Sequence, residues 1–561
     1  MGSDPRLKSG RLARYAAAGV LAAALAASAA ARGPVSAVPA RPDDPTIVHV
    51  LNRVGFGPRP GDVAHVREVG LAAWIDQQLQ PERIPDIAVE ARLRSYETLD
   101  LSSREIAQEY FLPAREHRKA KKARASAAGT VVGPNFSSAA SAGPSADAAS
   151  PEMKRARQVL VELSAQKIVR GVYSDRQLEE VLTDFWFNHF NVYAGKGLTR
   201  VFVTEYEREA IRPHVLGRFR DLLGATAKSP AMLFYLDNAR STRAGADMEG
   251  RGRLASPGEP AQQGGLAHPA RAGGARFASR GINENYAREL MELHTLGVDG
   301  GYTQQDVVNV ARAFTGWTIA GPRKAGAGRF VFNPRMHDTV EKVVLGHRIK
   351  AGGGIEDGEQ VLDILAAHPS TATFIATQLC RRFVSDTPPA PLVERATGVF
   401  RQTGGDLRAV TRAILTSPEF FAPESYRAKV KTPFDFVVSA LRATGADIRQ
   451  PVPLERTMRE LGMPLYFCQP PTGYKDTAEA WVNTGALINR MNFAVALAAN
   501  TFRGVVVSDP LPHRNRRDAE TAVDVFLNGD ASDTTRATIQ RATTAAQVVA
   551  LAIGAPEFQR K

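Results

Sequence analysis

Residues 283–303 read NENYARELMELHTLGVDGGYT, and the rest of the chain is organised around this stretch. Apolar side chains recur there at helical spacing, which predicts one helix from about Glu284 to Leu296. Gly297 has the position of the residue after a helix end, where a left-handed conformation is easiest for glycine. Thr303 then has the position of an N-cap, so the stretch predicts two helices joined by a glycine turn.

A polar arc lies along one side of the first predicted helix. Asn285, Arg288, Glu289 and Glu292 share one face of about 100°. Two interpretations stay open for this arc. In the structural one, Arg288 and Glu292 form an ion pair one turn apart. In the functional one, Arg288 and the two glutamates are catalytic or the carboxylates bind a metal, and Asn285 is a binding residue.

His294 suggests a metal site together with the two glutamates, but helical geometry argues against it. The histidine lies about 140° or more around the helix from both carboxylates, so one ion does not reach all of these side chains. A metal would need ligands from elsewhere in the chain, such as His189 or His337. The sequence alone identifies neither a metal nor a cofactor.

A second polar face is predicted on an aromatic helix at residues 176–191. Asp184 and Asn188 line one side of this helix, and His189 lies next to its apolar stripe. A histidine in that position is more often a satisfied core residue than a ligand. Polar groups on so apolar a helix are nevertheless costly to bury unpaired. Asp184, Asn188 and His189 are therefore binding candidates.

Beyond Trp317 the pattern changes from helical to alternating. Residues 328–334 and 342–349 alternate along the chain, and together they predict one small antiparallel β ribbon. His337 and Asp338 fall in the connection between these segments. They form either a catalytic general base with an orienting carboxylate or an Asx-type turn, and the sequence favours neither.

Aromatic side chains supply the remaining binding candidates. Tyr302 and Trp317 belong to the central block, and Trp481 begins a helix after an extended, proline-rich loop. Loop aromatics of this kind either stack on a sugar or a base, or plug the helical bundle. Both interpretations stay open for Trp481.

Length and composition indicate a mainly α globular protein. Of the 561 residues, 44% are hydrophobic and 23% are charged, which are the fractions of a globular fold. The helical patterns predict a multi-helix orthogonal bundle in a single large domain, residues 45–560. Two segments with few large apolar residues, 115–151 and 240–280, are predicted to be long disordered insertions. No internal apolar run reaches the ~20 residues of a membrane span.

Residues 1–31 have the organisation of a secretory signal peptide. Lys and Arg residues precede the alanine-rich segment 16–27, and small residues follow it. We therefore expect export to the periplasm or the extracellular space, with no transmembrane span after signal cleavage. The formal charge of +13 lies largely in low-complexity segments without a nucleic-acid-binding motif, so no nucleic-acid partner is expected. An acidic surface, such as an envelope polymer or lipid headgroups, fits an exported basic protein better.

The chain contains two cysteines, Cys380 and Cys468. Export would allow a disulfide between them, whereas Cys380 falls in an amphipathic helical pattern, where buried free thiols are common. Their separation in the sequence does not decide whether they pair. Their spacing matches no cysteine-based metal motif.

Several motifs resemble the bacterial domain-of-unknown-function 1800 family. Besides the block 283–317 and the loop region 461–490, they are HVLNRVGFG at 49–57, DFWFNH at 184–189, HDTVEKVVLG at 337–346 and APEFQ at 555–559. The resemblance covers nearly all of the chain after the predicted signal. It implies an exported protein, encoded beside a member of the domain-of-unknown-function 1501 family, which resembles sulfatases and phosphatases. It implies no reaction, because the family has no settled biochemistry.

Two functions of different classes follow from these observations. The first is a hydrolase acting on an envelope or extracellular polymer, with Glu289 or Glu292 working alongside His337 or His189. The second is a non-catalytic binding or assembly partner of the neighbouring sulfatase- or phosphatase-like protein. The sequence contains no G-x-S-x-G, H-E-x-x-H or phosphate-loop motif, so it does not decide between enzyme and partner.

Overall fold

The computed structural model describes residues 36–127, 150–243, 281–321, 326–508, 511 and 519–561. Within these ranges helices dominate, and the strands form three small antiparallel sheets of two strands each. The predicted mainly α, multi-helix fold is therefore confirmed. The predicted signal peptide, residues 1–31, lies outside the described residues.

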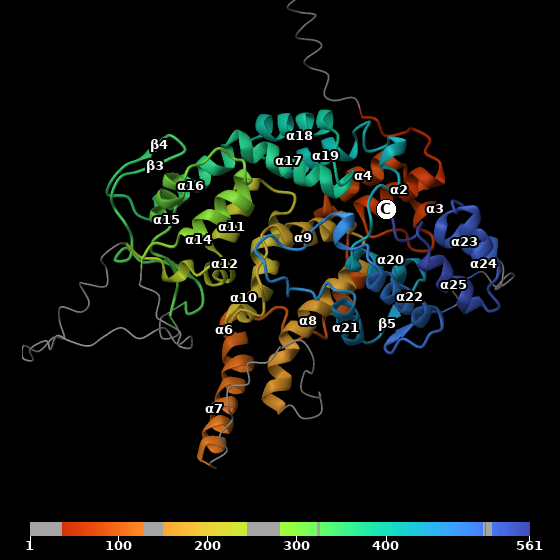
Figure 1. Cartoon of the computed structure of the whole chain (residues 1–561), viewed down its shortest axis with the longest axis horizontal. Helices are drawn as coiled ribbons and strands as arrows, with labels where there is room; N and C mark the ends of the chain where they lie inside the picture. Colours follow the sequence, from red (N-terminus) through yellow and green to blue (C-terminus); the bar gives the residue numbers. More distant parts are fainter. Residues whose placement is uncertain (1–35, 128–149, 244–280, 322–325, 509–510, 512–518) are drawn as a thin grey trace, which may run out of the picture.

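In the first half of the chain, α9 lies at the centre of the molecule. Helices α7 and α8 extend side by side from the lower side of the molecule (Figure 1). Ser150 and Ser229 cap α8 and α12, and each is followed by a proline at the first helical position. The helices of this half are α2 (Asp44–Val54), α3 (Asp62–Val69), α4 (Leu71–Gln78), α5 (Ile87–Leu93), α6 (Ser103–Glu105), α7 (Leu112–Ala127), α8 (Pro151–Tyr173), α9 (Gln177–His189), α10 (Thr199–Glu205), α11 (Phe219–Lys228) and α12 (Pro230–Tyr235).

The second half begins with the helical hairpin α14–α15, continues through α17, α18 and α19 along the top of the view, and ends in a group formed by α22, α23, α24 and α25 (Figure 1). Its helices are α14 (Glu284–Met291), α15 (Gln304–Ala313), α16 (Ile355–Ala367), α17 (Pro369–Phe383), α18 (Ala390–Thr403), α19 (Leu407–Leu415), α20 (Pro433–Ala443), α21 (Val452–Glu460), α22 (Thr484–Ala498), α23 (Ala519–Leu527), α24 (Asp533–Gln540) and α25 (Ala545–Gly554).

Two kinds of short helical turn complete these segments. Turns of π type, wider than an α-helix, occur at Ile106–Phe111, Tyr206–Ile211 and Glu292–Leu296. Tighter 3₁₀ turns occur at Pro81–Arg83, Arg212–His214, Asn238–Arg240, Pro423–Ser425 and Ala478–Ala480.

The strands form at the predicted residues, but they pair differently. β2 (Phe330–Phe332) pairs with β1 (Trp317–Ile319), and β3 (Lys342–Val344) pairs with β4 (His347–Ile349). The prediction that the two alternating segments form one ribbon is therefore wrong. Leu345 and Gly346, between β3 and β4, both have positive φ, as in a two-residue hairpin turn, so β3 folds back on β4. The third sheet pairs β5 (Asp447–Ile448) with β6 (Val505–Val506).

The two predicted disordered insertions differ from the structure at their edges. Helix α7 extends to Ala127, so residues 115–127 are helical and the first insertion was predicted to begin too early. Its remainder, 128–149, lies outside the described residues. Arg240 ends a 3₁₀ turn, and Thr242 N–H donates to the Gly281 carbonyl at 3.1 Å. Residues 244–280 lie outside the described residues.

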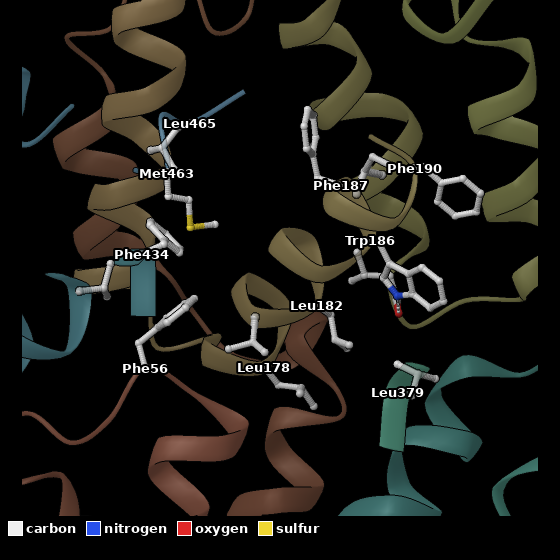
Figure 2. Packing of buried hydrophobic residues seen from close by; sticks show 14 of the residues in the cluster. Phe56, Leu178, Leu182, Trp186, Phe187, Phe190, Leu379, Phe434, Met463 and Leu465 are labelled. Atoms are coloured by element: carbon white, nitrogen blue, oxygen red, sulfur yellow. Dashed lines mark hydrogen bonds between the residues drawn. The ribbon is translucent and has the colours of Figure 1, made fainter. Parts of the chain in front are cut away.

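The main hydrophobic core is one contiguous cluster that extends from Ile47 to Phe558. Helix α9 runs through it, and Trp186 is fully buried there, with its indole N–H donating to the Val215 carbonyl at 3.2 Å. Figure 2 shows Trp186 and Phe187 of α9 across this part of the core from Phe434, Met463 and Leu465. The Phe187 ring packs edge-on against Tyr466, with centroids 4.9 Å apart. The same helix therefore contacts both the N-terminal and the C-terminal parts of the chain.

A buried carboxylate, Asp435 in the first turn of α20, joins three segments of this core. Its oxygens accept from Arg382 at 3.2 Å and from Lys561 Nζ at 2.8 Å. All these side chains are at most 4% exposed. Burial alone would raise the pKa of Asp435, but the two cations outweigh it and hold the pKa well below its usual range.

Replacing Asp435 by Asn is expected to destabilise the protein by about 3–5 kcal/mol, because Arg382 and Lys561 stay buried without their counter-charge. A carboxyl with a lowered pKa stabilises the fold above its unfolded-state pKa, so the difference from wild type should be full at pH 7 and shrink as the pH falls through the acid range. Urea unfolding at pH 7 and at an acidic pH measures this difference in the free energy of unfolding. The control is Asp363→Asn, which removes an exposed ion pair with Arg220 and should cost below about 1 kcal/mol. Equal losses in the two variants would contradict this account.

Candidate functional site

The predicted helix that bears the polar arc is present, but it changes type partway along. It starts at Asn283, whose side chain caps α14, and it continues from Met291 into the π-helical turn Glu292–Leu296. In this wider turn the Thr295 hydroxyl donates to the Leu290 carbonyl at 2.8 Å. Turns of this type inside α-helices are frequent at functional sites.

Arg288 does not form the ion pair that the structural interpretation predicted. Its guanidinium donates to Gln304 Oε1 at 2.9 Å and lies 4.0 Å from the Glu284 carboxylate. The side chain is 41% exposed. Arg288 therefore turns towards the start of α15, and Glu292 is left without a cation. Asn285, also on the arc, is exposed.

Glu289 and Glu292 are half-buried and adjacent on the arc. Glu292 accepts a hydrogen bond of 3.2 Å from the Tyr302 hydroxyl. Neither glutamate forms an ion pair with any residue that the structure describes. Burial, and then the neighbouring Glu292 carboxylate, raise the pKa of Glu289, and the Arg288 charge opposes this only in part. The pair therefore contains one carboxyl that holds its proton more tightly than usual.

Two histidines lie behind the arc, against the core. His189, at the end of α9, has its Nε2 3.1 Å from the His294 carbonyl oxygen in the π turn. The two ring centroids are 6.3 Å apart. Burial lowers the pKa of His189 to about 4 and that of His294 to about 3, so both rings are neutral at pH 7. His294 Nε2 is buried and has no hydrogen-bond partner among the described residues.

Asn188 attaches the proline-rich loop to the same end of α9. Its side-chain amide donates to the Tyr474 carbonyl and accepts from the Tyr474 N–H, both at 2.7 Å. A Cβ at Gly473, where φ is +68°, would collide with the Asn188 carbonyl, so this close approach requires glycine. Tyr235, which the sequence interpretation missed, donates to the Gln469 carbonyl at 2.5 Å. Asn188 is therefore a loop anchor.

Trp481 also belongs to the packing of this loop. It is 7% exposed, and its indole N–H donates to the Lys475 carbonyl at 2.9 Å. Its ring centroid lies 5.9 Å from that of Tyr474. Of the two interpretations of Trp481, the structure supports the one in which the ring fills space inside the helical bundle, and not the one in which it is open to a ligand.

His337 and Asp338 do not form the predicted catalytic pair. His337 is 2% exposed, with Nδ1 2.8 Å from the Thr315 carbonyl oxygen and Nε2 3.2 Å from Asp357 Oδ2. Asp338 instead binds Arg312 through both carboxylate oxygens, at 2.9 and 3.1 Å. Both residues fasten the segment between β2 and β3 to α15 and α16, and this burial argues against contact with a substrate.

Asp184 and Trp317 are likewise internal. Asp184 lies 2.8 Å from Lys167 Nζ, and both side chains are nearly buried. Trp317 is fully buried between Phe314 and Phe330, whose ring centroids lie 4.8 and 5.2 Å away. These environments argue against the predicted binding roles.

The structure thus divides the predicted site residues into two groups. The residues that it brings to one accessible face are Asn285, Arg288, Glu289, Glu292 and Tyr302. The residues that it uses in packing or internal networks are Asp184, Asn188, His189, Trp317, His337, Asp338 and Trp481.

Metal and disulfide chemistry receive no support from the described part of the chain. No group of three or more His, Cys, Asp or Glu side chains is placed there to hold a metal ion. Cys380 and Cys468 are both buried and free, so they do not pair with each other. Burial raises the pKa of Cys380 to about 12 and that of Cys468 to about 11. Within the same ranges, no helix is both long and apolar enough to cross a membrane.

Replacing Glu292 by Gln is expected to change the free energy of unfolding by less than about 1 kcal/mol. The Tyr302 hydroxyl can donate to the new amide oxygen, and the repulsion of Glu289 disappears. The matched variant Glu180→Gln should lose about 3–5 kcal/mol, because buried Glu180 binds Arg212 at 2.7 and 2.9 Å. Urea unfolding of both variants compares them, and a loss at Glu292 as large as that at Glu180 would restore the structural interpretation of the arc.

Comparisons with known proteins agree with the motifs of the sequence. The model of a family described as "Protein of unknown function (DUF1800)" matches residues 49–560. A search of curated proteins and a search of solved structures returned no match. Because the family match spans nearly the whole chain, this protein belongs to the DUF1800 family.

Proposed function

We propose that this protein is a hydrolase whose acid–base pair is Glu289 and Glu292. One observation supports this most strongly: two half-buried carboxylates lie side by side, and no described cation pairs with either. Elsewhere in this fold, buried carboxylates such as Asp435, Glu180 and Asp357 have a Lys or Arg partner. Like charges held close together without compensation are typical of acid–base sites.

The two carboxyl groups differ in a way that suits two roles. Glu289, whose raised pKa favours the protonated form, would be the acid that gives a proton to the leaving-group oxygen. Glu292, which accepts from the Tyr302 hydroxyl, would be the base that takes a proton from the attacking water. Glycoside hydrolysis uses such a pair of an acid and a base or nucleophile, so a glycosidic bond is the preferred target.

A polymer is the proposed substrate because the pair lies beside exposed positions. Asn285 and Asp299 on either side of the pair are exposed, and Arg288 is half-exposed. An extended chain could lie across this face, and the positive formal charge of the protein favours an acidic polymer. Residues 1–31 suggest that this polymer belongs to the envelope or the extracellular space.

An activity screen against glycoside, ester, phosphate and sulfate polymers tests the proposal. We expect glycoside hydrolysis by the wild type and a loss of about 10²–10⁴-fold in kcat in Glu289→Gln and Glu292→Gln. Glu284→Gln, an acidic residue of the same helix, is the matched control and should keep its activity. Because the pKa of Glu289 is raised, activity should fall as the pH rises through that pKa, and Glu289→Gln should lack this fall. Activity that survives both glutamate changes, or no activity on any class, would overturn the proposal.

A second candidate function is that of an assembly partner. Exposed apolar side chains on and just before α22 favour it, namely Val482, Leu487, Ile488 and Val495, which are 41–55% exposed. The partner proposed from the family resemblance is a secreted protein of the domain-of-unknown-function 1501 family. Co-purification of the two proteins should be lost in Leu487→Ser with Ile488→Ser and kept in Glu292→Gln. Failure of the wild type to co-purify would remove this candidate.

A further inference from the structure

A polar cleft lies far from the polar arc. It is formed by α2, α20, α23 and the segment around residues 557–561, on the opposite side of the view from α14 (Figure 1). The space inside it that is open to the centre of a water molecule is about 30 Å³. It therefore has room for a group of the size of a small ion or a few water molecules.

Lys431 is the unusual residue of this cleft. Its backbone is fixed, because its N–H donates to the Gln559 carbonyl at 2.9 Å and its carbonyl accepts from Arg490 at 2.8 Å. The side chain lines the cleft while the residue is only 3% exposed. Its ammonium lies 4.2 Å from the centre of the Phe558 ring, and it has no hydrogen bond or ion pair with a described residue. A buried amine without a counter-charge is costly to protonate.

The acidic groups around the cleft are already engaged. Glu557 accepts from Ser532 N–H and from the Thr535 hydroxyl, each at 3.0 Å. Asp435, in the first turn of α20, binds Lys561 and Arg382. Neither carboxylate forms an ion pair with Lys431.

The basic groups around the cleft are in excess. Arg427 pairs with Asp530 at 2.9 Å, Lys561 pairs with Asp435, and Arg560 is exposed where it lines the cleft. Burial first, and then the charges of Lys561, Arg427 and Arg490, lower the pKa of Lys431 to about 7, against the opposing effect of Asp435. His49, on α2, is also buried, and its pKa falls to about 3, so it adds no charge at pH 7.

We propose that this cleft binds a small oxyanion, such as a sulfate, phosphate or carboxylate group, through the Lys431 ammonium and the Arg560 guanidinium. The anion supplies the counter-charge that the protein lacks there, and charge-assisted hydrogen bonds to Lys431 would be strong in this buried position. An anion beside the amine also favours its protonated form. Binding at mildly alkaline pH is therefore coupled to the uptake of a proton by Lys431.

Calorimetry with sulfate tests the proposal, because sulfate does not titrate in this range and any proton taken up belongs to the protein. Titrations at pH 8 in two buffers of different ionisation enthalpy should show binding with uptake of up to about one proton, since most Lys431 amines are neutral there. At pH 6, where Lys431 is already protonated, the uptake should be close to zero. Sodium chloride at equal ionic strength serves as the blank.

Three variants assign the effect to the cleft. Lys431→Met should weaken sulfate binding at least tenfold, and Lys431→Arg should bind sulfate without proton uptake at pH 8. Arg560→Gln, a change at an exposed side chain, should weaken binding several-fold and leave the fold intact. Lys350→Met, a change at an exposed lysine outside the cleft, is the matched control and should behave as wild type. No sulfate binding by the wild type, or unchanged binding and proton uptake in the Arg560 and Lys431 variants, would overturn the proposal.

Discussion

The contact between His189 and the carbonyl of His294 joins the core of this protein to its candidate site. A π turn leaves some backbone carbonyls without a normal helical partner, and each needs another donor when it is buried. His189 donates to the carbonyl of His294, and the Thr295 hydroxyl lies 2.8 and 3.2 Å from the carbonyl oxygens of Leu290 and Met291. Because α9 is embedded in the aromatic core, this contact fixes the turn in which Glu292 lies.

The next residue along α9 extends the same principle to the proline-rich loop. Asn188 holds Tyr474 through two short hydrogen bonds, and the loop in turn accepts from Tyr235 at Gln469. The last turn of α9 therefore joins the π turn after α14 to the loop, and α12 binds the same loop through Tyr235. The motif around Asp184–His189 thus has a structural role, which explains why its polar residues need not contact a substrate.

Local features of this fold could be predicted from the sequence, whereas partners distant in the chain could not. Thr303 and Asp306 form the expected capping box, because a cap depends only on residues three apart. Arg288 had a partner available at the right helical spacing, yet it binds Gln304 from the next helix. His337 lies next to Asp338 in sequence but binds Asp357. The hairpin turn at Leu345, which has positive φ, was not predicted from the sequence. For Arg288 and His337, tertiary packing overrode the local pattern, whereas the hairpin turn was missed because leucine rarely adopts positive φ. The paired glutamates were found because helical periodicity alone places them together.

The protonation of Glu289 tests the central claim most directly. Infrared difference titration of the wild type against Glu289→Gln isolates the protonated carboxyl band of this one residue. The account predicts that Glu289 titrates above the usual range of a glutamate, and that Glu292→Gln moves its pKa back towards that range, because part of the shift comes from the neighbouring charge. An ordinary pKa for Glu289 that does not respond to Glu292→Gln would contradict the proposed acid–base pair.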